Sequence, residues 1–127
     1  MKYYDLLSEY EAETQAYSEA VGIAKSPYKI ITDGRLTGVR LIVSRNAATS
    51  LTNGVVVRLT CTDWTPNTIV VAAVGTGLQT APAPAAEVFD FDVDQKVVNG
   101  HQITVEGKCV DANDVTNSVL ILGRFEG

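Results

Sequence analysis

The chain has 127 residues, enough for one domain with a hydrophobic core and too few for two. Hydrophobic residues make up 46% and charged residues 20%, a composition typical of globular rather than disordered chains. The formal net charge is −5 without any run of basic residues, which argues against direct binding to nucleic acid, and no apolar run approaches the roughly 20 residues of a membrane span.

The first 26 residues differ in pattern from the rest and predict a helical arm, residues 1–26. Between residues 3 and 21, tyrosines and aliphatic residues recur every three or four positions without any Pro or Gly, which indicates a helix. Gly22 suits the end of this helix, and Ser26-Pro27 prevents its continuation. The side chains of the stripe that we expect at an interface are Tyr3, Leu7, Tyr10, Tyr17 and Val21.

An isolated helix of this length is marginal in water, so its apolar stripe must be buried. The stripe can pack on the chain's own β domain or on a neighbouring subunit, and the sequence is compatible with both. Tyrosine favours the second option, because it buries a large area at interfaces and keeps a polar tip for a partner. We therefore expect an arm that docks on a neighbour rather than a coiled coil, whose core prefers branched aliphatic residues.

From Pro27 onward, short alternating segments separated by turn signals predict a β domain over residues 27–127. The expected strands cover residues 28–32, 36–44, 55–62, 68–74, 87–98, 101–110 and 116–125. The apolar, β-branched segment 68–74 is expected to be buried on both faces. Asn99-Gly100 is the strongest hairpin signal, so residues 87–98 and 101–110 are expected to form a hairpin.

Seven or eight short antiparallel strands predict an all-β fold, an antiparallel β-sandwich of jelly-roll or immunoglobulin-like type with an N-terminal helix or arm. A long segment of Gly, Ala, Pro and Thr, residues 75–86, interrupts the strands and predicts a loop or an extended edge. Within it, Leu78, Pro82 and Pro84 are expected to contact a neighbouring subunit.

No pattern in the sequence predicts catalysis, a cofactor or a metal. The only histidine, His101, follows the Asn-Gly turn, and neither a nucleophile motif nor a nucleotide-binding glycine loop occurs. Asp90, Asp92 and Asp94 project from one face of a strand, which could contribute to a Ca²⁺ site. A solvated acidic face that discourages edge-to-edge pairing is the favoured interpretation.

Two cysteines, Cys61 and Cys109, fall on the core face of their strands and could be free thiols or a disulfide. The acidic N-terminal segment lacks the apolar core of a signal peptide, so we expect synthesis in a cytoplasm without export. Free buried thiols are the usual state in such a protein.

Trp64 lies in the loop after the clearest strand, next to Asp63 and Asn67. An exposed tryptophan there could stack on a sugar ring, although a single Trp can equally cap the core. A non-catalytic carbohydrate-binding β-sandwich that uses Trp64, Asp63 and Asn67 is therefore the alternative function.

A small acidic β domain with an N-terminal arm and a Pro-Ala loop resembles the single jelly-roll capsid or capsid-decoration proteins of bacterial or archaeal viruses. The resemblance rests on the β-sandwich pattern from Tyr28 to Phe125 plus the arm. It implies a virion protein made in the host cytoplasm, present in repeated copies as a homo-oligomer and in contact with other capsid proteins. No nucleic acid, membrane or small-molecule substrate is among the implied partners.

Overall fold

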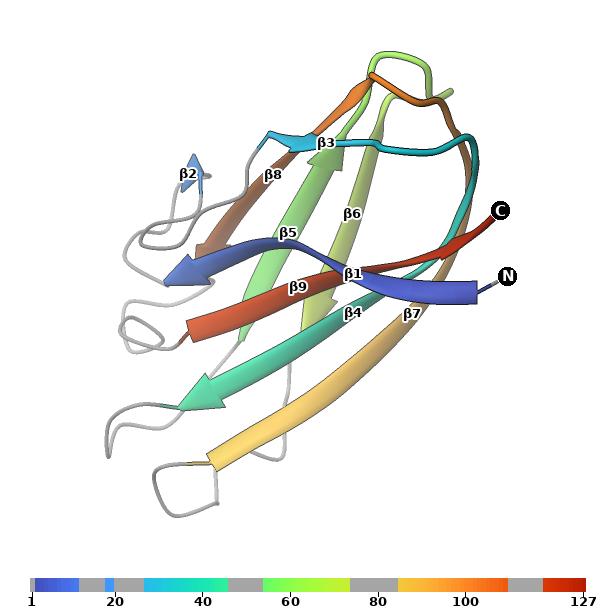
Figure 1. Cartoon of the computed structure of the whole chain (residues 1–127). Helices are drawn as coiled ribbons and strands as arrows, with labels where there is room; N and C mark the ends of the chain where they lie inside the picture. Colours follow the sequence, from blue (N-terminus) through green and yellow to red (C-terminus); the bar gives the residue numbers. More distant parts are fainter. Residues whose placement is uncertain (1, 12–17, 20–26, 46–53, 74–84, 110–117) are drawn as a thin grey trace.

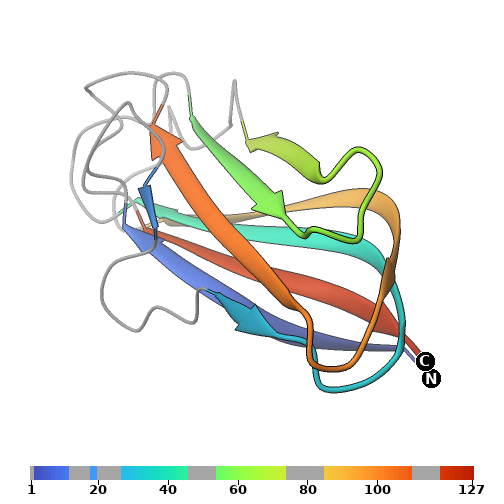
Figure 2. The ribbon, with the colours of Figure 1, turned by 90° about the horizontal axis from the view of Figure 1, so that it is seen from above.

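The computed structural model describes residues 2–11, 18–19, 27–45, 54–73, 85–109 and 118–127, which form two antiparallel sheets packed face to face. The two layers of this β-sandwich are visible in Figures 1 and 2. The strands are β1 (Lys2–Glu11), β2 (Ser18–Glu19), β3 (Tyr28–Lys29), β4 (Gly34–Arg45), β5 (Val55–Thr60), β6 (Thr68–Ala73), β7 (Ala85–Val97), β8 (Gln102–Cys109) and β9 (Ser118–Glu126).

The four-stranded sheet has the order β1-β9-β4-β7. The five-stranded sheet has the order β2-β8-β5-β6, and the short strand β3 also pairs with β8. Because Lys2 pairs with Glu126, the two ends of the described chain lie side by side (Figure 1). The edges of the four-stranded sheet are therefore β1 and β7.

Alternation of side chains along each strand places one set of residues between the sheets, as the sequence predicts. The core includes Val39, Leu41 and Val43 of β4, Val55, Val57 and Leu59 of β5, Ile103 and Val105 of β8, and Val119, Ile121 and Phe125 of β9. Cys61 and Cys109 are also buried on this side, and they are not joined in a disulfide. The β-sandwich expected from the strand pattern is thus observed.

Within the described residues, the expected N-terminal helix is not observed, since residues 2–11 form strand β1 and residues 18–19 form β2. Residues 12–17 and 20–26 of the expected arm lie outside the described residues. This strand pairs with β9 along its whole length and forms one edge of the four-stranded sheet. Residues 2–11 therefore belong to the sandwich and do not form a separate arm. Tertiary pairing overrides the helix propensity of the Leu and Glu residues here.

A β-bulge explains why the sequence of β1 imitates a helix. In a regular strand, Tyr3 and Tyr10 would face opposite sides, because they are an odd number of residues apart. In this structure the backbone register of β1 against β9 shifts between Leu6 and Ser8, so that Tyr3 is opposite Phe125 and Tyr10 is opposite Val119. Apolar residues at positions 3, 7 and 10 therefore fit a bulged strand as well as a helix.

The expected hairpin at Asn99-Gly100 is not formed, although the turn is present. The His101 N–H donates to Val98 O over 3.1 Å, and Gly100 has φ +93°. However, β7 pairs with β4 and β8 pairs with β5, so the chain crosses here from one sheet to the other. A turn signal specifies a local reversal but not the strands that pair afterwards.

Strand β6 is an edge strand, contrary to the expectation of burial on both faces. It pairs with β5 alone among the described strands, and Val70 exposes 55% of its surface to solvent. Only Val71 and Ala73 are buried. An apolar β-branched run does not by itself distinguish a central strand from an edge strand, because both can pack one face on the core.

Candidate functional site

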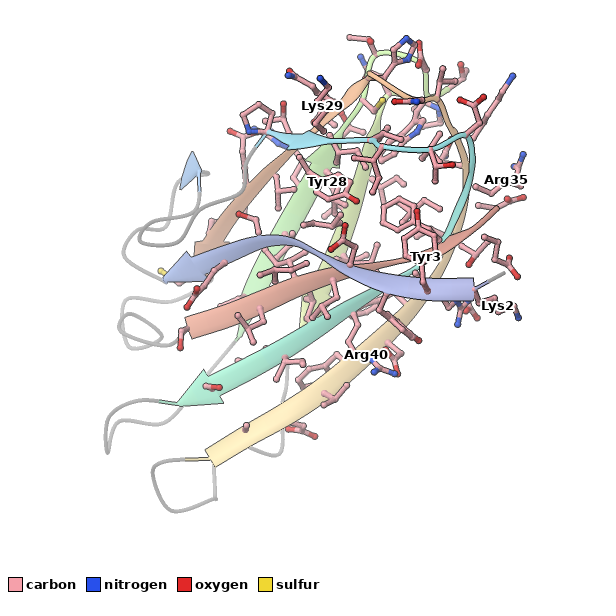
Figure 3. The ribbon with its side chains drawn as sticks, viewed as in Figure 1. Lys2, Tyr3, Tyr28, Lys29, Arg35 and Arg40 are labelled. Carbon is pink, nitrogen blue, oxygen red and sulfur yellow. The ribbon has the colours of Figure 1, made fainter. Side chains whose placement is uncertain are left out.

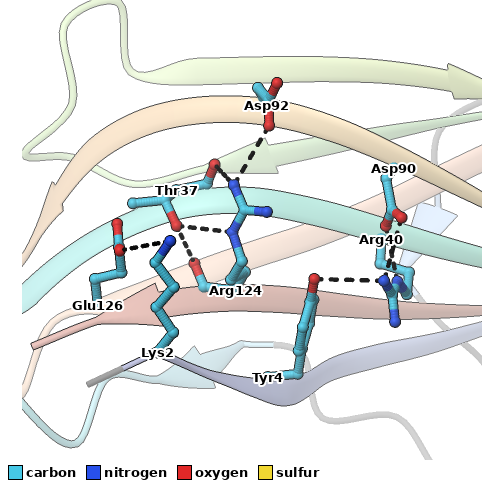
Figure 4. A network of polar contacts seen from close by, with 8 residues as sticks. All are labelled: Lys2, Tyr4, Thr37, Arg40, Asp90, Asp92, Arg124 and Glu126. Carbon is cyan, nitrogen blue, oxygen red and sulfur yellow. Dashed lines mark hydrogen bonds and ion pairs between the residues drawn. The ribbon is translucent and has the colours of Figure 1, made fainter.

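The outer face of the four-stranded sheet carries an ordered set of charged side chains, shown in Figures 3 and 4. Arg40 of β4 is bidentate to Asp90 of β7, with Nε–Oδ1 2.7 Å and Nη2–Oδ2 3.2 Å. Its guanidinium carbon also lies 4.5 Å from the ring centroid of Tyr4 on β1, a cation–π distance. The hydrogen bond from Arg40 lowers the pKa of the Asp90 carboxyl below its ordinary value.

Arg124 of β9 supports a second bulge, in β4. The register of β4 shifts between Leu36 and Gly38, which leaves Thr37 as the extra residue. Arg124 donates from Nη2 to Thr37 O over 2.9 Å and from Nε to Thr37 Oγ1 over 3.0 Å (Figure 4). Gly38 makes room for this contact, because a Cβ there would lie 3.1 Å from Cζ of Arg124.

Each aspartate of the acidic strand β7 is matched by an arginine, two from the neighbouring strand β4 and one from β9, the next strand beyond it. Besides the Arg40–Asp90 pair, Arg124 Nη2 lies 3.3 Å from Asp92 Oδ1, and Arg35 Nε lies 2.6 Å from Asp94 Oδ1. The three aspartates of the acidic face that the sequence predicts are therefore paired with arginines, in addition to being in contact with solvent. Among the described residues, no cluster of three or more His, Cys, Asp or Glu side chains is arranged to hold a metal ion.

Next to this ion-pair network, the same outer face carries a group of apolar side chains, with Glu9 beside Leu120 and Arg40 beside Leu122 at its margin. Register places Leu6 beside Leu122 and, in the next row, Leu120 beside Ile42 and Ile42 beside Val88. Val88 exposes 51% and Leu120 36% of its surface, and the other three are half-buried. We call these five residues the apolar patch. A continuous apolar patch that crosses four strands is a feature of interaction surfaces.

Tyr3 and Leu7, which were expected to face a partner subunit, lie in the chain's own core. Leu7 is fully buried, and the ring of Tyr3 stacks on Phe125 with a centroid distance of 5.5 Å. Tyr28 of β3 also stacks on Phe125, at 5.8 Å (Figure 3 labels both tyrosines). Tyr3 and Leu7 thus pack on the chain's own β domain, which is the other option that the sequence left open.

The remaining residues expected at an interface are not placed by the structure. Tyr10 lies on β1, but its side chain is outside the described residues. Tyr17, Val21, Leu78, Pro82 and Pro84 are also outside them.

Trp64 is buried and does not offer a stacking platform for a sugar. Only 3% of its surface is exposed, and its indole N–H donates to the backbone oxygen of Lys96 over 3.0 Å. Its neighbour Asp63 contacts His101, and Asn67 accepts the Cys61 N–H through its backbone oxygen. The expected sugar site at Trp64 is therefore wrong, and Trp64 caps the core.

Next to Asp63, a hollow of about 330 Å³ opens at one end of the outer face of the five-stranded sheet. Its lining includes Thr60 and Thr62 from β5 and the turn that follows, and His101, Gln102 and Thr104 from the start of β8. His101 is held by Asp63 through Nδ1. The surface of the hollow is mixed, more apolar than polar, and no lysine or arginine lines it.

The alternation of side chains along the strands does not predict the apolar patch, although the sequence contains another signal for it. In β4 and β9, Ile42, Leu120 and Leu122 occupy the outward phase, where polar residues are expected. The strand segments 41–43 and 119–122 are therefore apolar without interruption, which indicates that both faces are covered. Within the described ranges, the chain contains no helix with the length and apolar character of a membrane span.

No protein-family model and no curated protein sequence matches the chain. Among solved structures, it is similar to the globular domain of the zebrafish complement 1qA protein. The alignment covers 98% of this chain and 93% of that chain, with 10% sequence identity and a TM-score of 0.49.

Proposed function

We propose that this protein is a non-catalytic structural protein that self-associates through the apolar patch and serves as a capsid or capsid-decoration component of a virus. The observation that carries the proposal is the exposure of Val88 and Leu120 within a continuous apolar surface. Burial of such a surface stabilises an association by roughly 25 cal/mol for each Å² removed from water. A monomer would leave this surface in contact with solvent.

A second copy of the same chain is the proposed occupant, because charge favours it. The chain carries a net charge of −5, so two copies repel each other over most of their surfaces. On the outer face of the four-stranded sheet, described acidic and basic side chains occur in equal numbers. They are Lys2, Arg35, Arg40, Lys96 and Arg124 against Glu9, Asp90, Asp92, Asp94 and Glu126. Two copies can therefore meet on this face with little repulsion.

The size of the face also suits an interface between two copies. With four strands and the nine residues of β9, it measures roughly 30 Å by 19 Å at the usual spacings of a sheet. The corrugated surface of such a face approaches the ~800 Å² that each partner buries in a standard interface. A two-fold axis through the patch would bring the same residues of both copies together.

The capsid role is supported by the order of the strands and by the resemblance described above. Among the strands that the structure describes, β5 and β6 are the one consecutive pair hydrogen-bonded to each other, and most connections cross from one sheet to the other. We assign this arrangement to the jelly roll, a fold that capsid proteins use. The expected contacts of Leu78, Pro82 and Pro84 with a neighbour remain part of the proposal.

Light scattering behind a sizing column tests self-association with a pair of matched variants. Val88→Asn places a polar amide in the apolar patch, while Val70→Asn makes the same change on the edge strand of the other sheet, where Val70 is equally exposed. We expect a defined oligomer for the unaltered chain, a shift toward the monomer for Val88→Asn, and no shift for Val70→Asn.

A chain that remains monomeric at high concentration would contradict the proposal, as would an equal response of the two variants. Electron microscopy of the concentrated protein then tests the capsid role. Ordered shells or lattices are expected, whereas isolated dimers alone would contradict a role in a capsid shell.

A further inference from the structure

The hollow on the five-stranded sheet exists because two paired strands separate. The pairing of β5 with β8 ends at Thr60, which lies opposite Thr104. Beyond this point, the Cys61 N–H donates to Asn67 O over 3.0 Å, and His101 O accepts from the Ile30 N–H over 2.8 Å. Each chain thus turns to a different partner, and the space between them is left open with a volume of about 330 Å³.

We propose that this hollow binds a neutral polyhydroxyl ligand of the size of one sugar ring. Three threonines, Thr60, Thr62 and Thr104, contribute hydroxyls that both donate and accept, and Gln102 contributes an amide with both functions. Among the described residues, none of these four side chains has a hydrogen-bond partner. A ligand whose hydroxyls also donate and accept can satisfy all of them at once.

The charges around the hollow select against ionic ligands. No lysine or arginine lines it, so an anion would lack a counter-charge and would meet the carboxylate of Asp63 nearby. That carboxylate is already engaged by Nδ1 of His101, so a cation would have to compete with the imidazole. His101 keeps its second ring nitrogen for a ligand and is fixed in orientation by Asp63.

The size of the hollow sets the size of the ligand. Its volume lies at the lower end of the roughly 300–1,000 Å³ that small-molecule pockets span, which suits one ring rather than a chain of sugars. The methyl groups of the threonines can contact the C–H bonds of such a ring. The site uses neither Trp64 nor the apolar patch, so it is independent of self-association.

Nuclear magnetic resonance of the ¹⁵N-labelled full chain tests the proposal, with D-glucose, D-galactose and N-acetyl-D-glucosamine as separate probes and inorganic phosphate as the anionic comparison. We expect at least one sugar to shift the amide signals of Thr60, Gln102 and Thr104 in a saturable manner, and phosphate to leave them unchanged. The absence of saturable shifts with all three sugars, shifts located elsewhere, or a response to phosphate alone would overturn the proposal.

Threonine-to-valine variants locate the binding groups, because they keep the side-chain shape and remove one hydroxyl. Thr104→Val and Thr60→Val should each weaken sugar binding roughly 3- to 10-fold, the effect of one lost hydrogen bond. Thr68→Val is the matched control, since Thr68 lies opposite Thr60 in β6 but outside the lining of the hollow. Unchanged affinity in both Thr104→Val and Thr60→Val would refute the assignment of the site.

Discussion

The phenolic O–H of Tyr28 donates a hydrogen bond to Oδ2 of Asp5 over 2.6 Å, and this bond joins the two sheets of the sandwich. Tyr28 lies on β3, beside β8, whereas Asp5 lies on β1, at the edge of the opposite sheet. The other carboxylate oxygen of Asp5 accepts the N–H of Leu6 over 2.9 Å. The bond therefore fixes the N-terminal strand next to its bulge.

Removal of this hydroxyl should destabilise the fold without removing the aromatic packing. Tyr28→Phe keeps the stack on Phe125 but loses the bond to a charged acceptor, so we expect the free energy of unfolding to fall by about 1–2 kcal/mol. Tyr3→Phe is the control, because Tyr3 stacks on the same ring and its hydroxyl has no hydrogen bond within the described part of the chain. Urea denaturation measures both, and equal losses would contradict a role for the Asp5 contact.

The same tyrosine should make stability depend on alkaline pH. Burial, together with the hydrogen bond to Asp5, raises the pKa of Tyr28 above its ordinary value of about 10. Above that pH the unfolded chain releases this proton while the folded chain keeps it, so stability falls by up to about 1.4 kcal/mol per pH unit. Below pH 10 both states hold the proton, and the contribution is fully present. Tyr28→Phe should lack this decline, so the stability difference between the two proteins should narrow as the pH rises from 10 to 11.

A side chain at position 123 is expected to destabilise the folded protein. Gly123 faces the core between β1 and β4, and a Cβ there would lie 2.9 Å from both Leu36 Cδ1 and Phe125 Cε2, and 3.2 Å from Leu7 Cδ2. Gly123→Ala should therefore lower the free energy of unfolding by about 1–3 kcal/mol through overpacking. Gly127→Ala, with no atom within 4 Å of the new Cβ, should have no effect in the same chemical denaturation experiment. If Gly123→Ala has the same free energy of unfolding as the unaltered chain, the side chains around position 123, including the ring of Phe125, can shift to make room for the methyl group.

Loss of Arg124 should cost more stability than loss of Arg35, although both form surface ion pairs. Arg35 contacts only the exposed Asp94, and exposed pairs of this kind contribute little. Arg124 also donates to the backbone oxygen of Thr37 at the bulge of β4, which alanine would leave without this donor. We expect Arg124→Ala to reduce the melting temperature and Arg35→Ala to leave it nearly unchanged. Similar melting temperatures for the two variants would mean that solvent replaces Arg124 at the bulge.

Both cysteines should be protected thiols in the folded protein. Cys61 and Cys109 are buried and are not joined in a disulfide, and burial raises the pKa of the Cys61 thiol, which reduces the reactive thiolate. Iodoacetamide should label neither residue in the native protein and both residues in guanidinium chloride. Mass spectrometry reads the result, and failure to label the unfolded chain without a reductant would indicate a disulfide instead.

Interactions within a few residues account for what the sequence predicted correctly. Because side chains alternate along any strand, the inward residues of β4, β5, β8 and β9 follow from the positions of apolar residues alone. Turn residues likewise mark where strands end, and Asn99-Gly100 follows the end of β7 in this way.

Only tertiary structure decided which strands pair, because pairing depends on residues far apart in the sequence. Pairing with β9 turned residues 2–11 into a bulged strand, and pairing of β7 with β4 rather than β8 removed the expected hairpin. The same pairing brought three dispersed arginines onto three aspartates of β7, and gathered Leu6, Ile42, Val88, Leu120 and Leu122 into one patch. The sequence alone thus determined a sandwich and the inward side of most strands. The surface that we propose for assembly emerged only from the order of the strands in the sheet.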